Sequence, residues 1–214
     1  MSVSASDIAA LRNQTGAGMM DCKNALEEAG GDVEKAVDIL RKKGIAKAAK
    51  RAGKVAAEGQ VVSYIHGEGR IGVLLDLNCE TDFVAKTDAF KQLALDIAMH
   101  VAAAKPLYVS RTDVPDMMLQ AEKDIYRVQL QTEGKPADMI EKIVEGKMSK
   151  YFAEVCLLEQ SFIKDEEKTI EQILAAKTAE IGEKISVRRF ARYELGEGIE
   201  REKKDFAAEV AEQL

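Results

Sequence analysis

Residues 60–78 read QVVSYIHGEGRIGVLLDLN, and they predict a β-hairpin. Two runs rich in apolar and β-branched residues, 60–66 and 70–78, flank the turn Gly67-Glu68-Gly69. One more strand is expected from about Ile185 to Leu195. Because helical patterns surround these strands on both sides, the sequence predicts an α+β fold.

Residues 1 to about 44 carry the signals of three short helices. Ser4 with Asp7 forms a capping-box pattern, Gly30-Gly31 ends the second helix, and Asp32 caps the third, which is expected to stop at Gly44. The expected apolar stripes are Ile8 and Leu11, then Met19, Cys22, Leu26 and Ala29, then Val33, Ala36, Val37 and Leu40. A bundle this small is marginal alone, so it is interpreted as a docking module, followed by a partly helical linker over 45–57.

Longer helices are expected after the hairpin. One is capped near Thr87 or Asp88 and ends at Lys105-Pro106. A helical hairpin spans 114 to about 158, with its turn at 133–136, and a capping box at Thr169 starts another helix. The expected buried stripes are Phe90, Leu93, Ala94, Ile97 and Val101 in the first, Met118, Ala121, Ile125 and Val128 in one arm of the hairpin, and Met139, Ile143, Val144, Met148, Phe152 and Val155 in the other.

Composition limits the class of protein. The chain has 214 residues, is 46% hydrophobic and carries a net charge of −6, so it is long enough to bury a core and too acidic to coat nucleic acid over its whole surface. The three cysteines are too few and too dispersed for a disulfide scaffold and fit a reducing compartment. Neither a secretory signal nor a membrane-spanning apolar run is seen, so we expect a soluble cytoplasmic protein without a membrane partner.

No constellation for catalysis or metal binding is apparent. The two histidines, His66 and His100, match no zinc or catalytic-triad spacing. Residues 67–72 match GxGxxG, but a strand follows where a dinucleotide site needs a helix, so the glycines are interpreted as a hairpin turn. We therefore expect neither a cofactor nor a metal, and a protein that is not an enzyme.

A run of cations at 41–54 contains no acidic residue: Arg41, Lys42, Lys43, Lys47, Lys50, Arg51 and Lys54. It fits either a nucleic-acid patch or a solvated helix end. No aromatic residue is interleaved to stack bases, which favours the solvated helix end and no direct nucleic-acid partner.

Two short features fit contacts with a protein partner. Met19 and Met20 are adjacent, so at most one of them lies on the core face of its helix. The exposed one is either an adaptable partner contact or a loosely covered surface residue, and the periodicity leaves both open. Phe83 follows the predicted hairpin and is out of register with the next helical stripe. Phe83 either wedges into a partner, with Asp82 beside it, or folds back over the sheet edge. The sequence alone favours the second alternative.

Two long motifs then identify a family. Residues 15–23 read TGAGMMDCK, and residues 78–86 read NCETDFVAK. They resemble the two signatures of bacterial elongation factor Ts, the guanine nucleotide exchange factor for elongation factor Tu, a GTPase that delivers aminoacyl-tRNA to the ribosome. Shorter matches follow in order at 97–101, 134–136, 144–146 and 206–210.

The resemblance implies a fold with three parts. Residues 1–54 correspond to a ubiquitin-associated-like three-helix domain and linker. Residues 55–196 correspond to a core in which helices pack on a small antiparallel sheet, with a protruding antiparallel coiled coil at about 114–158. Residues 197–214 correspond to a C-terminal helical tail.

The resemblance also implies which residues meet the partner. Within Thr81, Asp82, Phe83 and Val84, the Asp82 and Phe83 side chains would intrude into the GTPase domain of elongation factor Tu near its Mg²⁺ site. Arg12, Met19 and Met20 would contact the same domain, and Phe206 and Val210 of the tail would add to that contact. Stabilising the nucleotide-free partner and displacing Mg²⁺ would then release GDP without covalent chemistry.

One departure from the family concerns its hairpin subdomain. Many members carry it twice, and this chain shows one copy, as in the short form of the family. We therefore expect a homodimer in which each chain supplies half of a composite core. Two rival hypotheses are an RNA-binding adaptor that uses residues 41–54 and a peptide-binding module confined to residues 1–44.

Overall fold

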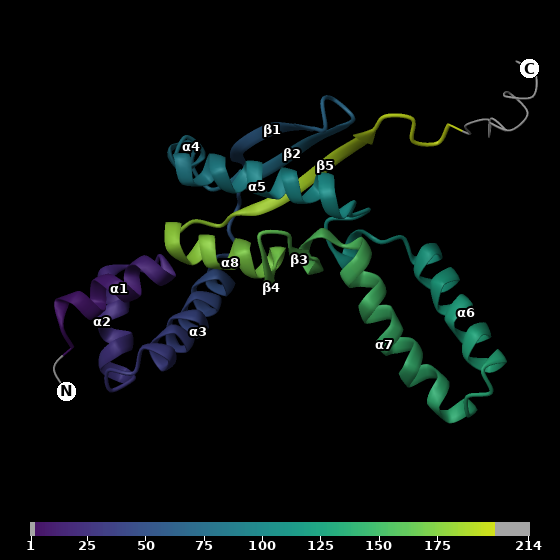
Figure 1. The fold of residues 1–214 in the computed structure, drawn as a ribbon, viewed down its shortest axis with the longest axis horizontal. Helices are drawn as coiled ribbons and strands as arrows, with labels where there is room; N and C mark the ends of the chain where they lie inside the picture. The colour runs from purple at the N-terminus through teal and green to yellow at the C-terminus, as the bar shows by residue number, and fades with distance from the viewer. Residues whose placement is uncertain (1–2, 200–214) are drawn as a thin grey trace, which may run out of the picture.

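The computed structural model describes residues 3–199 and has an α+β fold. Within this range, eight α-helices accompany a three-stranded antiparallel sheet and a two-stranded hairpin. The N-terminal helices and a long helical hairpin project from opposite ends of the central unit, on the side away from the sheet (Figure 1). The predicted tail helix, with Phe206 and Val210, lies outside the described residues.

The sheet has the strand order β1–β2–β5. Strands β1 (Glu58–His66) and β2 (Ile71–Cys79) form the predicted hairpin, and β5 (Ser186–Glu194) pairs with β2. The hairpin and its turn are confirmed. Gly59 allows the close approach of the two strands, because its φ is 144° and a Cβ there would lie 2.1 Å from the Leu77 carbonyl oxygen.

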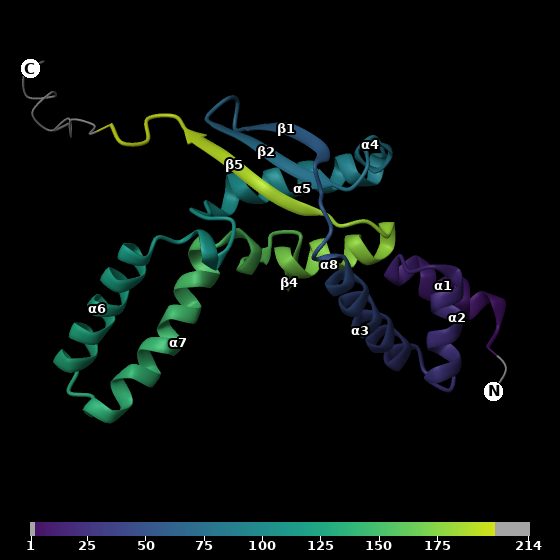
Figure 2. The ribbon, with the colours of Figure 1, turned by 180° about the vertical axis from the view of Figure 1, so that it is seen from behind.

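One face of the sheet carries the main core. Helix α5 (Asp88–Ala104) covers this face, as Figures 1 and 2 show from opposite sides, and Thr87 caps it as predicted. All five residues of its predicted stripe are buried, and they pack with Val73, Leu75 and Leu77 of β2. Helix α8 (Ile170–Ile181) begins at the predicted Thr169 capping box and packs Ile170 and Leu174 into the same core.

The three N-terminal helices are present, with two corrections. They are α1 (Ala5–Thr15), α2 (Met19–Glu28) and α3 (Val33–Arg51). The prediction that Gly44 ends the third helix was wrong. At Gly44 the helix passes close to α8, where a Cβ would lie 3.4 Å from the Ala179 Cβ, so this glycine permits a close helix–helix approach. Met19 and Val33 are also exposed rather than in the small core formed by Leu11, Cys22, Ala25, Leu26, Ala36 and Leu40.

The long hairpin consists of α6 (Asp116–Thr132) and α7 (Ala137–Val155). The stripe predicted for its first arm was wrong, because Met118, Ala121, Ile125 and Val128 are all exposed. The inward face of α6 is instead formed by Leu119, Tyr126 and Leu130, which pack on Ile140, Val144 and Met148 of α7. In the second arm Met139 is exposed, and Ile140 takes its place in the packed face.

Short elements join these units. The 3-10 turns η1 (Arg111–Asp113) and η2 (Leu157–Glu159) flank the base of the long hairpin. Strands β3 (Ser161–Phe162) and β4 (Asp165–Thr169) form a small hairpin before α8, which the sequence pattern did not predict. Helix α4 (Asp82–Ala85) connects β2 to α5 and holds the Phe83 motif.

Candidate partner-binding surface

The Thr81–Val84 turn presents Phe83 to solvent. It forms the start of α4, where the Thr81 hydroxyl accepts a hydrogen bond from the Val84 N–H at 3.4 Å. Val84 packs against the main core and Ala85 is buried, so the turn is anchored on one side. The Phe83 side chain is 79% exposed, which excludes the alternative that it folds back over the sheet edge.

Asp82 provides a negative charge beside this aromatic ring. The Lys86 ammonium donates a hydrogen bond to the Asp82 carboxylate at 2.5 Å, and this bond lowers the carboxyl pKa below its usual range. The carboxylate is therefore ionised at neutral pH. On the other side of the turn, the buried Cys79 thiol donates to the Thr81 carbonyl at 3.1 Å, and burial raises the thiol pKa.

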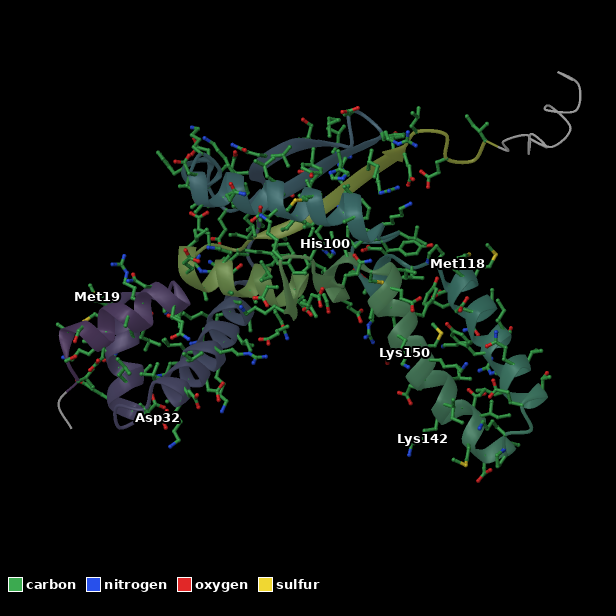
Figure 3. The ribbon with its side chains drawn as sticks, in the orientation of Figure 1. Met19, Asp32, His100, Met118, Lys142 and Lys150 are labelled. Carbon is green, nitrogen blue, oxygen red and sulfur yellow. The ribbon has the colours of Figure 1, made fainter. Side chains whose placement is uncertain are left out.

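A second exposed apolar group lies on the N-terminal helices. Met19 and Met20 are 52% and 64% exposed at the start of α2, and Arg12 is exposed on the last turn of α1. Figure 3 shows Met19 on the side of the N-terminal helices that is farther from the long hairpin. Both ribbon views place α4 and the N-terminal helices at the same end of the molecule (Figures 1 and 2).

A third exposed apolar region is the open face of the sheet, the side opposite α5. Its large apolar side chains are Val61 and Ile65 of β1, Leu74 of β2 and Tyr193 of β5, all at least half exposed, and the Asp76–Arg189 ion pair lies on the same face. The strand register aligns Ser63, Leu74 and Ala191 in one row and Ile65, Gly72 and Tyr193 in the next. The sequence analysis missed this face, because Val61, Val62, Tyr64 and Ile65 give large side chains to both faces of β1 and the pattern does not alternate.

Three of the seven cations of 41–54 pair with acidic groups. Lys43 pairs with Glu28 at 2.6 Å, Lys47 with Asp21 at 2.7 Å, and Arg51 with Glu80 at 2.9 Å. These pairs neutralise part of the run that would face a phosphate backbone, which weakens the RNA-binding alternative.

The two histidines lie in different surroundings. His100 is fully buried in the centre of the molecule (Figure 3), where Nε2 and the Gln160 Oε1 are 3.0 Å apart and Nδ1 accepts from the Ile163 N–H at 3.4 Å. Burial lowers the His100 pKa, so the ring is neutral. His66 Nδ1 lies 3.1 Å from the Tyr64 hydroxyl at the end of β1.

Over residues 3–199, no three His, Cys, Asp or Glu side chains are arranged to hold a metal ion. No helix in that same range is both long and apolar enough to span a bilayer.

The chain is similar to known proteins over nearly its whole length. A family model described as elongation factor TS matches residues 10–197. The elongation factor Ts of Desulfitobacterium hafniense is 59% identical over 212 residues, covering 99% of this chain and 98% of that protein. That of Carboxydothermus hydrogenoformans is 62% identical over 201 residues, covering 94% and 93%, and that of Geobacter sulfurreducens is 57% identical over 211 residues, covering 99% and 98%.

Proposed function

The chain belongs to the elongation factor Ts family, the nucleotide exchange factors for elongation factor Tu in translation, and we propose that it releases GDP by inserting Phe83 into the GTPase domain. The observation that carries this proposal is the 79% exposure of Phe83 on a turn whose neighbours are anchored in the core. A large aromatic side chain that is exposed to water contributes much binding free energy when a pocket of the partner covers it.

The proposed mechanism is thermodynamic linkage. The protein binds nucleotide-free elongation factor Tu more tightly than the GDP-bound form, so the same coupling free energy weakens GDP binding. Insertion of Asp82 and Phe83 near the Mg²⁺ site displaces the ion, and GDP loses the charge that neutralises its phosphates. Every proposed step is non-covalent, so the protein needs neither a cofactor nor a metal of its own. We also propose that it acts in the cytoplasm.

The N-terminal helices supply a second contact with the same GTPase domain in this proposal. Met19 and Met20 form its apolar part, and Arg12 lies on the neighbouring helix. Their place at the same end of the molecule as α4 supports binding to a single partner (Figure 1). Phe206 and Val210, outside the described residues, are proposed to add to this contact.

The finer features of the fold follow the same proposal. We assign α1–α3 to a ubiquitin-associated-like domain with its linker over residues 1–54, and α6–α7 to an antiparallel coiled coil within a core of residues 55–196. Residues 197–214 form the third part, the tail.

We further propose a homodimer through the open face of the sheet. Val61, Ile65, Leu74 and Tyr193 give this face a size and apolar character that a second copy would cover symmetrically. The helical units project from the other side of the molecule, so they leave this face accessible (Figure 2).

Release of a fluorescent GDP from elongation factor Tu tests the function. We expect this protein to accelerate release strongly when free Mg²⁺ is abundant. When a chelator removes Mg²⁺, the partner already releases GDP faster, so the additional acceleration should shrink. An equal acceleration with and without Mg²⁺ would contradict ion displacement, and no acceleration by folded protein would contradict the function itself.

A further inference from the structure

We infer that Glu183, Glu80 and Arg51 are positioning residues that hold the Thr81–Val84 turn in its exchange-competent geometry and connect it to the N-terminal helices. This inference rests on the exchange function proposed above. None of the three side chains belongs to the exposed groups assigned to the partner. Each acts through the turn that carries Phe83.

Glu183 fixes the first residue of the turn. Its carboxylate accepts two hydrogen bonds from Thr81, one from the backbone N–H at 3.0 Å and one from the hydroxyl at 2.7 Å. The same hydroxyl also accepts a hydrogen bond from the Val84 N–H, so it donates to Glu183 and accepts from Val84 at the same time. Hydrogen bonds to an ionised carboxylate are about twice as strong as neutral ones, so Glu183 sets where α4 begins.

The segment that carries Glu183 is itself held firmly. It follows the end of α8, and the buried Thr178 hydroxyl accepts a hydrogen bond from the Ile185 N–H at 3.2 Å. Ile185 is buried in the main core. The carboxylate therefore holds Thr81 from a fixed base, although the two residues are more than a hundred positions apart in sequence.

Glu80 forms a second connection next to the first. Its carboxylate accepts from the Arg51 guanidinium at 2.9 and 3.2 Å and from the Lys184 backbone N–H at 2.7 Å. Glu80, which precedes the turn, and Thr81, which begins it, are thus bonded to two adjacent residues after α8, Lys184 and Glu183. The Glu80 side chain is only 16% exposed, which strengthens both bonds relative to a surface pair.

Arg51 extends this connection to the N-terminal helices. It lies on the last turn of α3, the helix that contributes Ala36 and Leu40 to the small N-terminal core. The Lys184 ammonium reinforces the same junction by donating to the Ala52 and Lys54 carbonyls at 2.8 and 3.0 Å. Helix α3 is the last of the three N-terminal helices, which also carry Met19 and Met20. Through Arg51 it is therefore hydrogen-bonded directly to Glu80, the residue before the Thr81–Val84 turn.

This arrangement makes the two partner contacts one preorganised surface. Without it, a four-residue helix bearing an exposed Phe would sample several orientations, and binding would have to select one of them. The apparent affinity falls in proportion to the fraction of molecules in the competent orientation, whereas the maximal exchange rate of the bound complex is retained.

The test compares Glu183→Gln with Glu166→Gln, an exposed carboxylate on β4. GDP release from elongation factor Tu is followed over a range of factor concentrations. For Glu183→Gln we expect the half-saturating concentration to rise about tenfold, the scale of one charge-assisted hydrogen bond, with the maximal rate nearly unchanged. In a Phe83→Ala background the same change should have almost no effect, because no aromatic side chain remains to be positioned.

Arg51→Met is compared with Lys50→Met in the same way. The Arg51 side chain is 41% exposed and its pair is screened by solvent, so we expect a smaller rise of about threefold in the half-saturating concentration. Hydrogen–deuterium exchange of the free protein provides a readout without the partner. Uptake over residues 80–86 should increase in Glu183→Gln and Arg51→Met and stay unchanged in both controls.

The outcomes separate the inference from the function. If the wild type accelerates GDP release and Glu183→Gln behaves as Glu166→Gln, the positioning role is refuted and the exchange function stands. A loss of equal size with Phe83 intact and in the Phe83→Ala background would also refute it, because the substitution would then act through general destabilisation. If the wild type itself fails to accelerate release, the exchange function is refuted and the positioning role for exchange fails with it.

Discussion

Replacing Phe83 by alanine tests the proposed exchange mechanism with little disturbance of the fold. The side chain is 79% exposed, so its removal forfeits almost no buried surface. Surface substitutions of this kind usually change the free energy of unfolding by less than about 0.5 kcal/mol. The thermal midpoint of Phe83→Ala should therefore match that of the wild type.

The effect on the partner should be much larger. Complete burial of a Phe side chain contributes about 1.5–3 kcal/mol relative to an exposed one. Since about 1.4 kcal/mol corresponds to a factor of ten, Phe83→Ala should slow GDP release by about 10- to 150-fold at equal, subsaturating factor concentration. A stopped-flow experiment with a fluorescent GDP bound to elongation factor Tu measures this rate directly.

Met117→Ala provides the control, because Met117 is 77% exposed on α6 and is assigned no contact with the GTPase domain. Its exchange rate should equal that of the wild type. If Phe83→Ala is folded and exchanges as fast as Met117→Ala, the reasoning from exposure to insertion is wrong, and the catalytic contact lies elsewhere on the surface.

Three further predictions concern stability and assembly. Gly59→Ala should lower the free energy of unfolding by about 3 kcal/mol, because a Cβ would lie 2.1 Å from the Leu77 carbonyl oxygen. Urea unfolding measures this change. Gly53→Ala is the control, because a Cβ at Gly53 meets nothing within 4 Å. A wild-type value for Gly59→Ala would contradict the close approach of the strands. Because burial lowers the His100 pKa from 6.5, the unfolded state takes up a proton that the folded state does not, so stability should fall as pH drops below 6.5. The decrease should be shallower in His100→Gln, and equal slopes down to about pH 5.5 would argue against a neutral buried ring. Leu74→Glu on the open face of the sheet should convert the proposed homodimer to a monomer in light scattering, whereas Leu107→Glu, which is also exposed but lies off the sheet, should retain the mass of a dimer. One mass for both variants would place the interface elsewhere.

Elements with strong local signals were predicted well. The hairpin of β1 and β2, the Thr87 cap of α5 and the Thr169 capping box all occur where the sequence indicates. The two caps and the hairpin turn depend on hydrogen bonds between residues three positions apart, and the strands pair outward from that turn, so a short window of sequence contains the necessary information. The α5 stripe was also correct, since that helix has one continuous apolar face.

Helix α6 shows why periodicity was insufficient. Two sets of apolar residues share its helical spacing, Met118 with Ile125 and Leu119 with Tyr126. Both sets fit the spacing of a buried helix face, so the sequence alone could not decide which set faces α7. Packing against Val144 and Met148 selects Leu119 and Tyr126, and the other set remains on the surface.

The sequence by itself determined the family, the order of the long helices and of the three main strands, and the motif that contains Phe83, because each is encoded in consecutive residues. The tertiary structure alone decided that α3 continues past Gly44 against α8, that Phe83 faces solvent, and that Glu183 holds Thr81. These outcomes depend on contacts between segments far apart in the chain. The free energy of such contacts exists only once the main core has brought the segments together.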